Sequence, residues 1–172
     1  MKPSFWERLD GQARALTPFG IAVLLALVNG LPSYTKGFVV VAPALPMMAI
    51  FHWSVYRPDL VPIHAVFTVG LLHDILAGTP LGVSALIYTV VYRGGVGQRR
   101  FLHGKSFLVV WLGFAVVALA AQAATWVAVS VMSMSPLIAN GLIHQYFVTI
   151  GVFPSLAWGL IKWQRMVLDE ET

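Results

Sequence analysis

Apolar residues occur in long runs along this chain, rather than in the alternation of a half-buried strand or the one-sided stripe of a soluble helix. A helix needs about 20 apolar residues to cross a bilayer. The runs predict membrane-spanning helices at residues 19–34, 38–55, 61–78, 81–92, 107–132 and 137–163. Pro43 and Pro46 are expected to kink the second of these helices. The fourth is short, because it holds only about a dozen residues.

Basic residues decide whether this short fourth segment crosses the bilayer or forms a re-entrant hairpin. Six crossings place all but one of the 11 Lys and Arg residues on one side of the membrane, and Lys36 on the other. Basic residues collect on the cytoplasmic side of membrane proteins. If the fourth segment did not cross, Lys162 and Arg165 would lie opposite the basic residues of the amino-terminal segment. The charge pattern therefore favours six crossings with both termini in the cytoplasm.

The same map divides the chain into one transmembrane domain, residues 18–164, and two cytoplasmic segments. Residues 1–17 carry apolar positions at helical spacing, and Ser4 and Glu7 have the spacing of a capping box. This favours a short amphipathic helix in the membrane interface, with a disordered tail as the alternative. Residues 165–172 are expected to form a cytoplasmic tail. The glycines and basic residues of 93–105 predict a flexible cytoplasmic loop suited to anionic lipid headgroups.

Composition agrees with a membrane protein and argues against several kinds of chemistry. Hydrophobic residues make up 58% of the chain and charged residues only 10%, whereas soluble domains carry roughly 25% charged residues. The absence of Cys excludes disulfides, thiolate metal sites and cysteine nucleophiles. The basic loops account for the formal net charge of +4, so no nucleic-acid partner is expected. No catalytic motif is present, and we therefore expect no enzymatic activity, cofactor or metal.

Asp74 is the one acidic residue inside the predicted spans. A carboxylate at the centre of a membrane helix costs about 2.5–3.5 kcal/mol on insertion scales. Gly70, Asp74 and Gly78 recur every fourth residue, so they are expected to share one helical face, and glycines at that spacing let a second helix come close. We interpret this face as a packing contact, either internal or with a partner. The alternatives are that Asp74 hydrogen-bonds the turn at residues 78–82, or that it handles a proton or a ligand.

Other polar residues of the predicted spans are candidates for the interior of the helix bundle: Asn29, His64, Gln122, Asn140, His144 and Gln145. Hydrogen bonds between membrane helices are worth roughly 0.6 kcal/mol each. We interpret these residues as packing contacts, with a ligand pocket around Asn140 and His144 as the alternative. A run of small residues in the last helix is expected to pack closely against another helix: Gly151, Ser155 and Gly159.

One pattern of residues covers the start of the third predicted helix and the connection after it: Arg57, Pro58, Gly70, Asp74, Gly78 and Gly82. This pattern resembles the hallmark of the bacterial rod shape-determining protein MreD family. The chain length, the six spans, the cytoplasmic termini and the lack of outer domains resemble that family as well. His73 departs from the apolar residue expected before the aspartate. The resemblance implies an all-α integral membrane fold and a non-enzymatic subunit of the cell-elongation machinery in the bacterial inner membrane.

The resemblance also implies partners and an alternative function. The implied partners are an MreC-like bitopic protein, the actin-like MreB, the RodA glycosyltransferase with its penicillin-binding transpeptidase, and membrane lipids. The implied fold is similar to the S-component fold of energy-coupling-factor transporters, so the alternative is a substrate-capture subunit of a vitamin transporter. A capture pocket needs several convergent polar groups. The short outer connections and the few polar residues disfavour this alternative.

Overall fold

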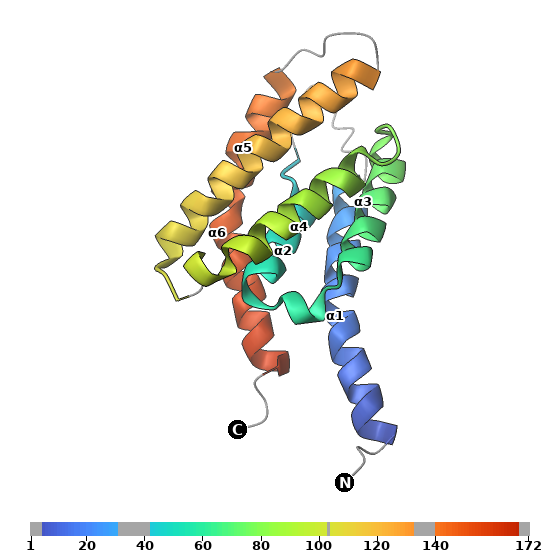
Figure 1. Ribbon diagram of the computed structural model, residues 1–172, viewed down its shortest axis with the longest axis vertical. Coiled ribbons are helices and arrows are strands. Elements are labelled where there is room, and N and C mark those ends of the chain that lie inside the picture. The colour runs from blue at the N-terminus through green and yellow to red at the C-terminus, as the bar shows by residue number, and fades with distance from the viewer. Residues whose placement is uncertain (1–4, 31–41, 103, 133–139, 169–172) are drawn as a thin grey trace.

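The computed structural model describes residues 5–30, 42–102, 104–132 and 140–168, and side chains are described for most of them. These residues form six α-helices and one short 3-10 helix, with no β-strand among them (Figure 1). The elements are α1 (Phe5–Gly30), α2 (Leu45–Tyr56), η1 (Pro58–Leu60), α3 (Ile63–Ala77), α4 (Val83–Leu102), α5 (Phe107–Met132) and α6 (Asn140–Leu168). The predicted all-α class is therefore confirmed for the described part of the chain.

The helix α5 is the clearest candidate for a membrane span. Among the described residues, α5 is the one helix that is long enough and apolar enough to cross a bilayer, judged by length and composition alone. Thr17–Gly30 of α1 and the whole of α3 are shorter apolar helices. Several large apolar side chains of α5 are exposed: Leu108, Leu112, Val116, Leu119, Val127 and Val131. Because lipid tails are as apolar as these side chains, such a surface suits a bilayer rather than water.

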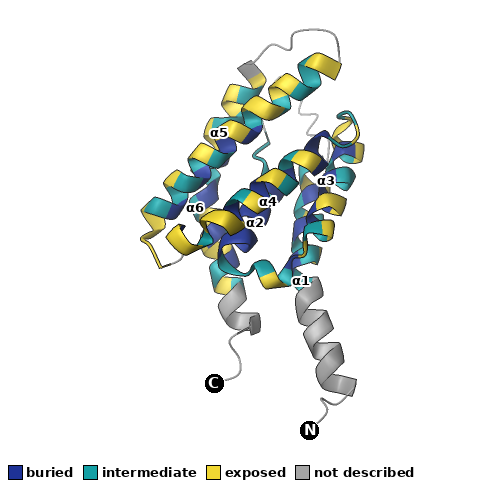
Figure 2. Ribbon diagram, viewed as in Figure 1, coloured by how far each residue is buried: buried dark blue, intermediate teal, exposed yellow. Residues whose placement is uncertain are grey.

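The shortest α-helix, α2, forms the centre of the molecule. Every residue from Pro46 to Val55 is buried (Figure 2). The helices α1, α4 and α6 all pack against α2. The ring of Phe51 lies 5.3 Å from that of Phe114 in α5 and 6.1 Å from that of Phe153 in α6. A helix that is apolar on all sides is typical of a bundle core.

Neither proline bends α2, so the predicted kinks are wrong: Pro43 precedes the helix and Pro46 lies at its beginning. Pro46 lies in the first turn of α2, where a missing backbone N–H leaves no hydrogen bond unmade. The N-cap residue Ala44 donates its own N–H to Thr149 Oγ1 of α6 at 3.0 Å. The helix begins at Leu45, later than the predicted residue 38, and residues 31–41 lie outside the described part of the chain.

The helix α4 is longer than predicted, because it continues through the first part of the segment expected to be a flexible loop. It has 20 residues and ends at Leu102. A Cβ on Gly95 would collide with the side chain of Ser54 in α2, and would lie 2.9 Å from the Ser54 Cβ. This glycine therefore lets α4 lie directly against α2. A residue that weakens helices in water serves here as a packing residue, as is common between membrane helices.

Residues 5–30 form one continuous helix, so the amino-terminal segment and the first predicted span are not separate elements. The side chains of residues 5–16 and all of Ser4 lie outside the description, and the amphipathic character of this segment stays a prediction. The amino end of α1 and the carboxyl end of α6 lie at the same end of the molecule, opposite the turn between α3 and α4 (Figure 1).

Candidate functional site

The carboxylate of Asp74 caps the beginning of α4. The side chain lies near the end of α3 and is fully buried. Its Oδ1 accepts hydrogen bonds from Thr79 Oγ1 at 2.7 Å and from the Ser84 N–H at 3.0 Å. Its Oδ2 accepts from the Gly82 N–H at 2.9 Å. The first backbone N–H groups of a helix have no acceptor within that helix. Asp74 supplies this acceptor to α4 from the neighbouring helix.

This arrangement explains how the chain tolerates a buried acid. The N-terminus of a helix carries a partial positive charge of roughly half an elementary charge. Hydrogen bonds to an ionised acceptor are about twice as strong as neutral ones. Both oxygens of Asp74 are occupied by uncharged donors of the α3–α4 connection. The hydrogen bonds of Asp74 therefore connect α3 to the beginning of α4.

Each glycine near Asp74 has its own role. A Cβ on Gly70 would lie 2.6 Å from the backbone nitrogen of Ala85 and 2.9 Å from the carbonyl carbon of Ser84, so α4 crosses α3 in backbone contact. Gly78 ends α3 with φ of 67°, and Gly82 precedes α4 with φ of 97°. Only glycine adopts such left-handed conformations freely. The structure thus corrects the single helical face expected from the spacing, since Gly78 and Gly82 form the turn, and a Cβ on either would have no described residue within 4 Å.

His73 joins three helices. Its Nε2 lies 3.0 Å from Asn29 Oδ1 of α1, and its Nδ1 lies 3.2 Å from Ser84 Oγ of α4. Asn29 in turn donates to the carbonyl of Pro43. A neutral imidazole can donate from one nitrogen and accept at the other. In the sequence, His73 stands out only as a departure from an expected apolar residue, and nothing there indicates these two partners.

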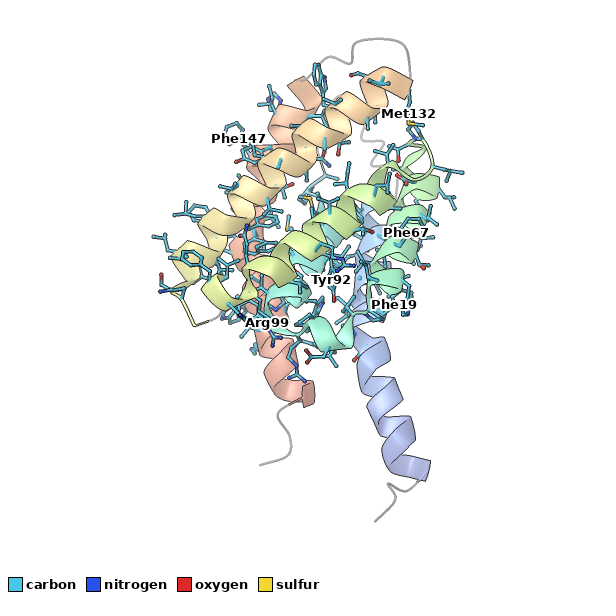
Figure 3. The ribbon with its side chains drawn as sticks, in the orientation of Figure 1. Phe19, Phe67, Tyr92, Arg99, Met132 and Phe147 are labelled. Carbon is cyan, nitrogen blue, oxygen red and sulfur yellow. The ribbon has the colours of Figure 1, made fainter. Side chains whose placement is uncertain are left out.

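The Arg57-Pro58 turn, which precedes α3, attaches to the middle of α4. Tyr92 of α4 donates its hydroxyl to the Pro58 carbonyl at 3.0 Å. Asp59 lies between Arg57, at 3.7 Å, and Arg99 of α4, at 3.8 Å. Figure 3 shows Tyr92 and Arg99 along this side of α4. Exposed ion pairs are worth only about 0–1 kcal/mol, so the buried tyrosine makes the main contact. The α3–α4 hairpin is therefore fixed at both ends.

The structure places the other polar candidates at several locations. His64 is exposed near the start of α3, and His144 is exposed on α6. The side chain of Asn140 lies outside the description. Gln122 of α5 donates to Gln145 of α6 at 3.1 Å, and Gln145 donates to the Ala42 carbonyl at 3.1 Å. The glutamine pair thus links two helices.

The small residues of α6 do not pack within the described part of this chain. Gly151, Ser155 and Gly159 are all exposed. A Cβ on either glycine would have no neighbour within 4 Å. The close packing expected for this run is therefore absent from the interior of the molecule. Phe147, on the same helix, projects away from the molecule as well (Figure 3).

A cavity of about 360 Å³ lies beside the Asp74 cap. The polar residues that line it come from α1, from the α3–α4 hairpin and from α5 and α6: Asn29, His73, Thr79, Ser84, Tyr88, Gln122, Thr125 and Gln145. No Asp, Glu, Lys or Arg of the described residues lines it. The described residues contain no group of three or more His, Cys, Asp or Glu side chains that could hold a metal ion.

A family model described as rod shape-determining protein MreD matches residues 13–167, which include the whole α3–α4 hairpin. The chain belongs to the MreD family. The family suggested by the pattern around Asp74 is thereby confirmed. The family is one of bacterial membrane proteins, which agrees with the exposed apolar surface of α5. Membership does not favour the vitamin-capture alternative.

A curated relative, the rod shape-determining protein MreD of Haemophilus influenzae, is 26% identical to this chain over 87 residues. The aligned residues cover 51% of this chain and 49% of the relative, so the match spans about half the length of that relative. No solved structure matches the chain. The expected similarity to the S-component fold stays a prediction.

Proposed function

We propose that this protein is a non-enzymatic membrane subunit of the bacterial cell-elongation machinery, which maintains rod shape by scaffolding peptidoglycan synthesis through helix–helix contacts. Family membership supports the rod-shape role. The observation that carries the scaffolding role is the arrangement of Asp74, whose two oxygens are both occupied in capping α4. The only acid of the predicted spans thus has a structural role, because it holds the beginning of α4 against α3.

The pattern residues act from inside the molecule in this proposal. Gly70 sets the crossing of α3 and α4, Asp74 holds the turn, and Gly78 and Gly82 allow its backbone conformation. Pro58 attaches the opposite end of the hairpin through Tyr92. Together they fix the outer surfaces of the helices, which partners recognise. The partners we propose are an MreC-like bitopic protein, actin-like MreB, and the RodA glycosyltransferase with its penicillin-binding transpeptidase.

We also propose that the chain crosses the inner membrane six times with both termini in the cytoplasm. The common end of α1 and α6 supports this, since two chain ends on one side require an even number of crossings. In this topology the carboxyl ends of α2, α4 and α6 are cytoplasmic, and several basic residues lie at or near these ends: Arg57, Arg99, Arg100, Lys105 and Lys162. Positive charge at the cytoplasmic side is the general rule.

The test is complementation of a rod-shaped bacterium that lacks its own MreD-family protein. We expect Gly70→Leu and Asp74→Ala to give round cells although the protein is still found in the membrane fraction. Gly97→Leu is the matched control, because Gly97 is also a glycine of a helix but has open space beside it. It should restore rods. Rods of normal width from all three variants, at equal protein levels, would refute the proposed role of the hairpin.

A further inference from the structure

The cavity beside the Asp74 cap has hydrogen-bonding capacity that the protein leaves unused. Tyr88 lines the cavity and is only 5% exposed, yet its hydroxyl group forms no hydrogen bond with the described residues. Gln122 donates to Gln145, while its own side-chain carbonyl accepts nothing from the described residues. Neither the Tyr88 hydroxyl nor the Gln122 side-chain oxygen is among the fully enclosed polar atoms of the described residues, so both are open to the cavity. A donor and an acceptor on the same cavity wall can therefore bind a polar occupant.

The charges around the cavity limit what this occupant is. No Asp, Glu, Lys or Arg of the described residues lines the cavity, so the described lining offers a charged group no partner of opposite charge. The carboxylate of Asp74 lies directly behind Thr79 and Ser84 of the cavity wall, and would repel an anion. The volume of about 360 Å³ is within the range of small-molecule sites. The lining therefore favours an uncharged group that both donates and accepts hydrogen bonds.

An apolar groove lies next to this cavity, on the outside of the molecule. It has a volume of about 260 Å³ and lies between α4 and α5. Ile87 and Ala121 line both the cavity and the groove, so the two spaces adjoin. The rest of the groove is formed by apolar and small residues, among them Val90, Gly94 and Ala124. A polar cavity beside an apolar groove offers an amphiphile one surface for its headgroup and another for its chain.

We propose that the cavity and the groove together bind one lipid with an uncharged, hydrogen-bonding headgroup. The headgroup occupies the cavity and contacts Tyr88 and Gln122, and one acyl chain follows the groove past Gly94. This assignment rests on the topology proposed above, in which the α3–α4 turn faces the outer side of the membrane. The groove then leads from the cavity toward the middle of the bilayer, which is the orientation of a lipid of the outer leaflet.

The experiment is native mass spectrometry of the full chain released from detergent, with one added probe at a time. The probes are glucosyl dioleoylglycerol, dioleoyl phosphatidylglycerol and methyl glucoside. We expect one copy of the glucosyl lipid to bind, with much weaker binding of the anionic lipid and none of the free sugar. Tyr88→Phe keeps the ring and removes the hydroxyl, and should weaken glucosyl lipid binding roughly fivefold, the value of one hydrogen bond.

A pair of glycine variants tests the groove. Gly94 and Gly97 both lie in α4 with open space beside them, but only Gly94 lines the groove. Gly94→Leu should weaken glucosyl lipid binding at least as much as Tyr88→Phe, and Gly97→Leu should leave it unchanged. Equal effects of the two glycine variants, equal binding of the anionic lipid, equal binding of methyl glucoside, or no retention of the glucosyl lipid would each overturn the proposal. None of these readouts depends on cell shape, so the scaffolding proposal stands or fails separately.

Discussion

The two carboxylate oxygens of Asp74 accept hydrogen bonds from backbone N–H groups at the beginning of α4. A change at Asp74 therefore also affects these donors. Asp74→Asn keeps one acceptor oxygen but directs an NH₂ group at backbone N–H groups. We expect it to lower the free energy of unfolding by about 1–3 kcal/mol. Asp74→Ala leaves the N–H groups of Gly82 and Ser84 without an acceptor, and should lower it further.

Unfolding of the purified protein in mixed micelles, followed by circular dichroism, measures both changes. Asp59→Asn is the matched control, since Asp59 is exposed and makes only long ion pairs. Its effect should stay within about 0.5 kcal/mol. An Asp74→Ala protein as stable as the Asp59→Asn protein would contradict the capping role.

The glycines near Asp74 allow a second test, because Gly78 and Gly70 are needed for different reasons. Gly78 has φ of 67°, a conformation that Asn tolerates better than Ala. Gly78→Asn should therefore be more stable than Gly78→Ala. At Gly70 the order should reverse, because the larger side chain meets the backbone of Ala85. Thermal unfolding of the four variants measures this, and the same order at both positions would disprove the distinction.

The sequence could show that Asp74 needs partners, because a bare carboxylate in lipid is costly. The sequence also offered hydrogen bonds to the turn at residues 78–82 as an alternative, which the structure confirms, but it could not decide between this turn and a packed helix face. That outcome depends on the left-handed backbone of Gly78 and Gly82, whereas a spacing of four residues also suits a packed helix face. The hydrogen bonds of His73 with Asn29 and Ser84 could not be predicted from the sequence either, since they join residues distant in the chain.

Among the helices, α4 shows most clearly how glycine serves packing. Gly95→Leu should force α4 away from Ser54 and lower the free energy of unfolding by roughly 1–3 kcal/mol, the usual range for overpacking. Gly97→Leu, two residues further along the helix, should change stability little, because Gly97 has open space beside it. Unfolding in the same micelles measures both. Equal stability of the two variants would show that α4 does not lie against α2.

Helix ends were harder to predict than helices. The segment from Arg93 onward looks like a loop because it combines glycines with basic residues, yet it is helical to Leu102. The signal that could have corrected this is the buried position of Gly95, which sequence alone does not give. Pro43 and Pro46 were similarly ambiguous, because a proline suits the first turn of a helix as well as a kink.

For the molecule as a whole, the proposed topology is open to a direct test because the natural sequence has no Cys. Leu81→Cys lies in the exposed α3–α4 turn, and Ser106→Cys lies in the exposed connection between α4 and α5. A membrane-impermeant maleimide should label the first in intact spheroplasts and the second only after permeabilisation. Labelling of both from the same side would mean that α4 does not cross the membrane.

The all-α class could be predicted from apolar runs alone, but the layering of the helices could not. Both α2 and α5 are strongly apolar, yet Pro46–Val55 of α2 are buried while much of α5 is exposed. Hydropathy does not separate a helix covered by protein from one covered by lipid, because both surroundings are apolar. The central position of α2 therefore could not be predicted from the sequence and is known only from the structure.

The partners of Asp74 all lie within ten residues of it along the chain, and this has a consequence for how the protein enters the membrane. A translocon releases segments in order, and α3, its turn and α4 can leave it as a preformed pair. The acid then meets the acyl chains with its charge already hydrogen-bonded, without waiting for the later helices. We therefore expect the hairpin to form before α5 and α6 have been synthesised.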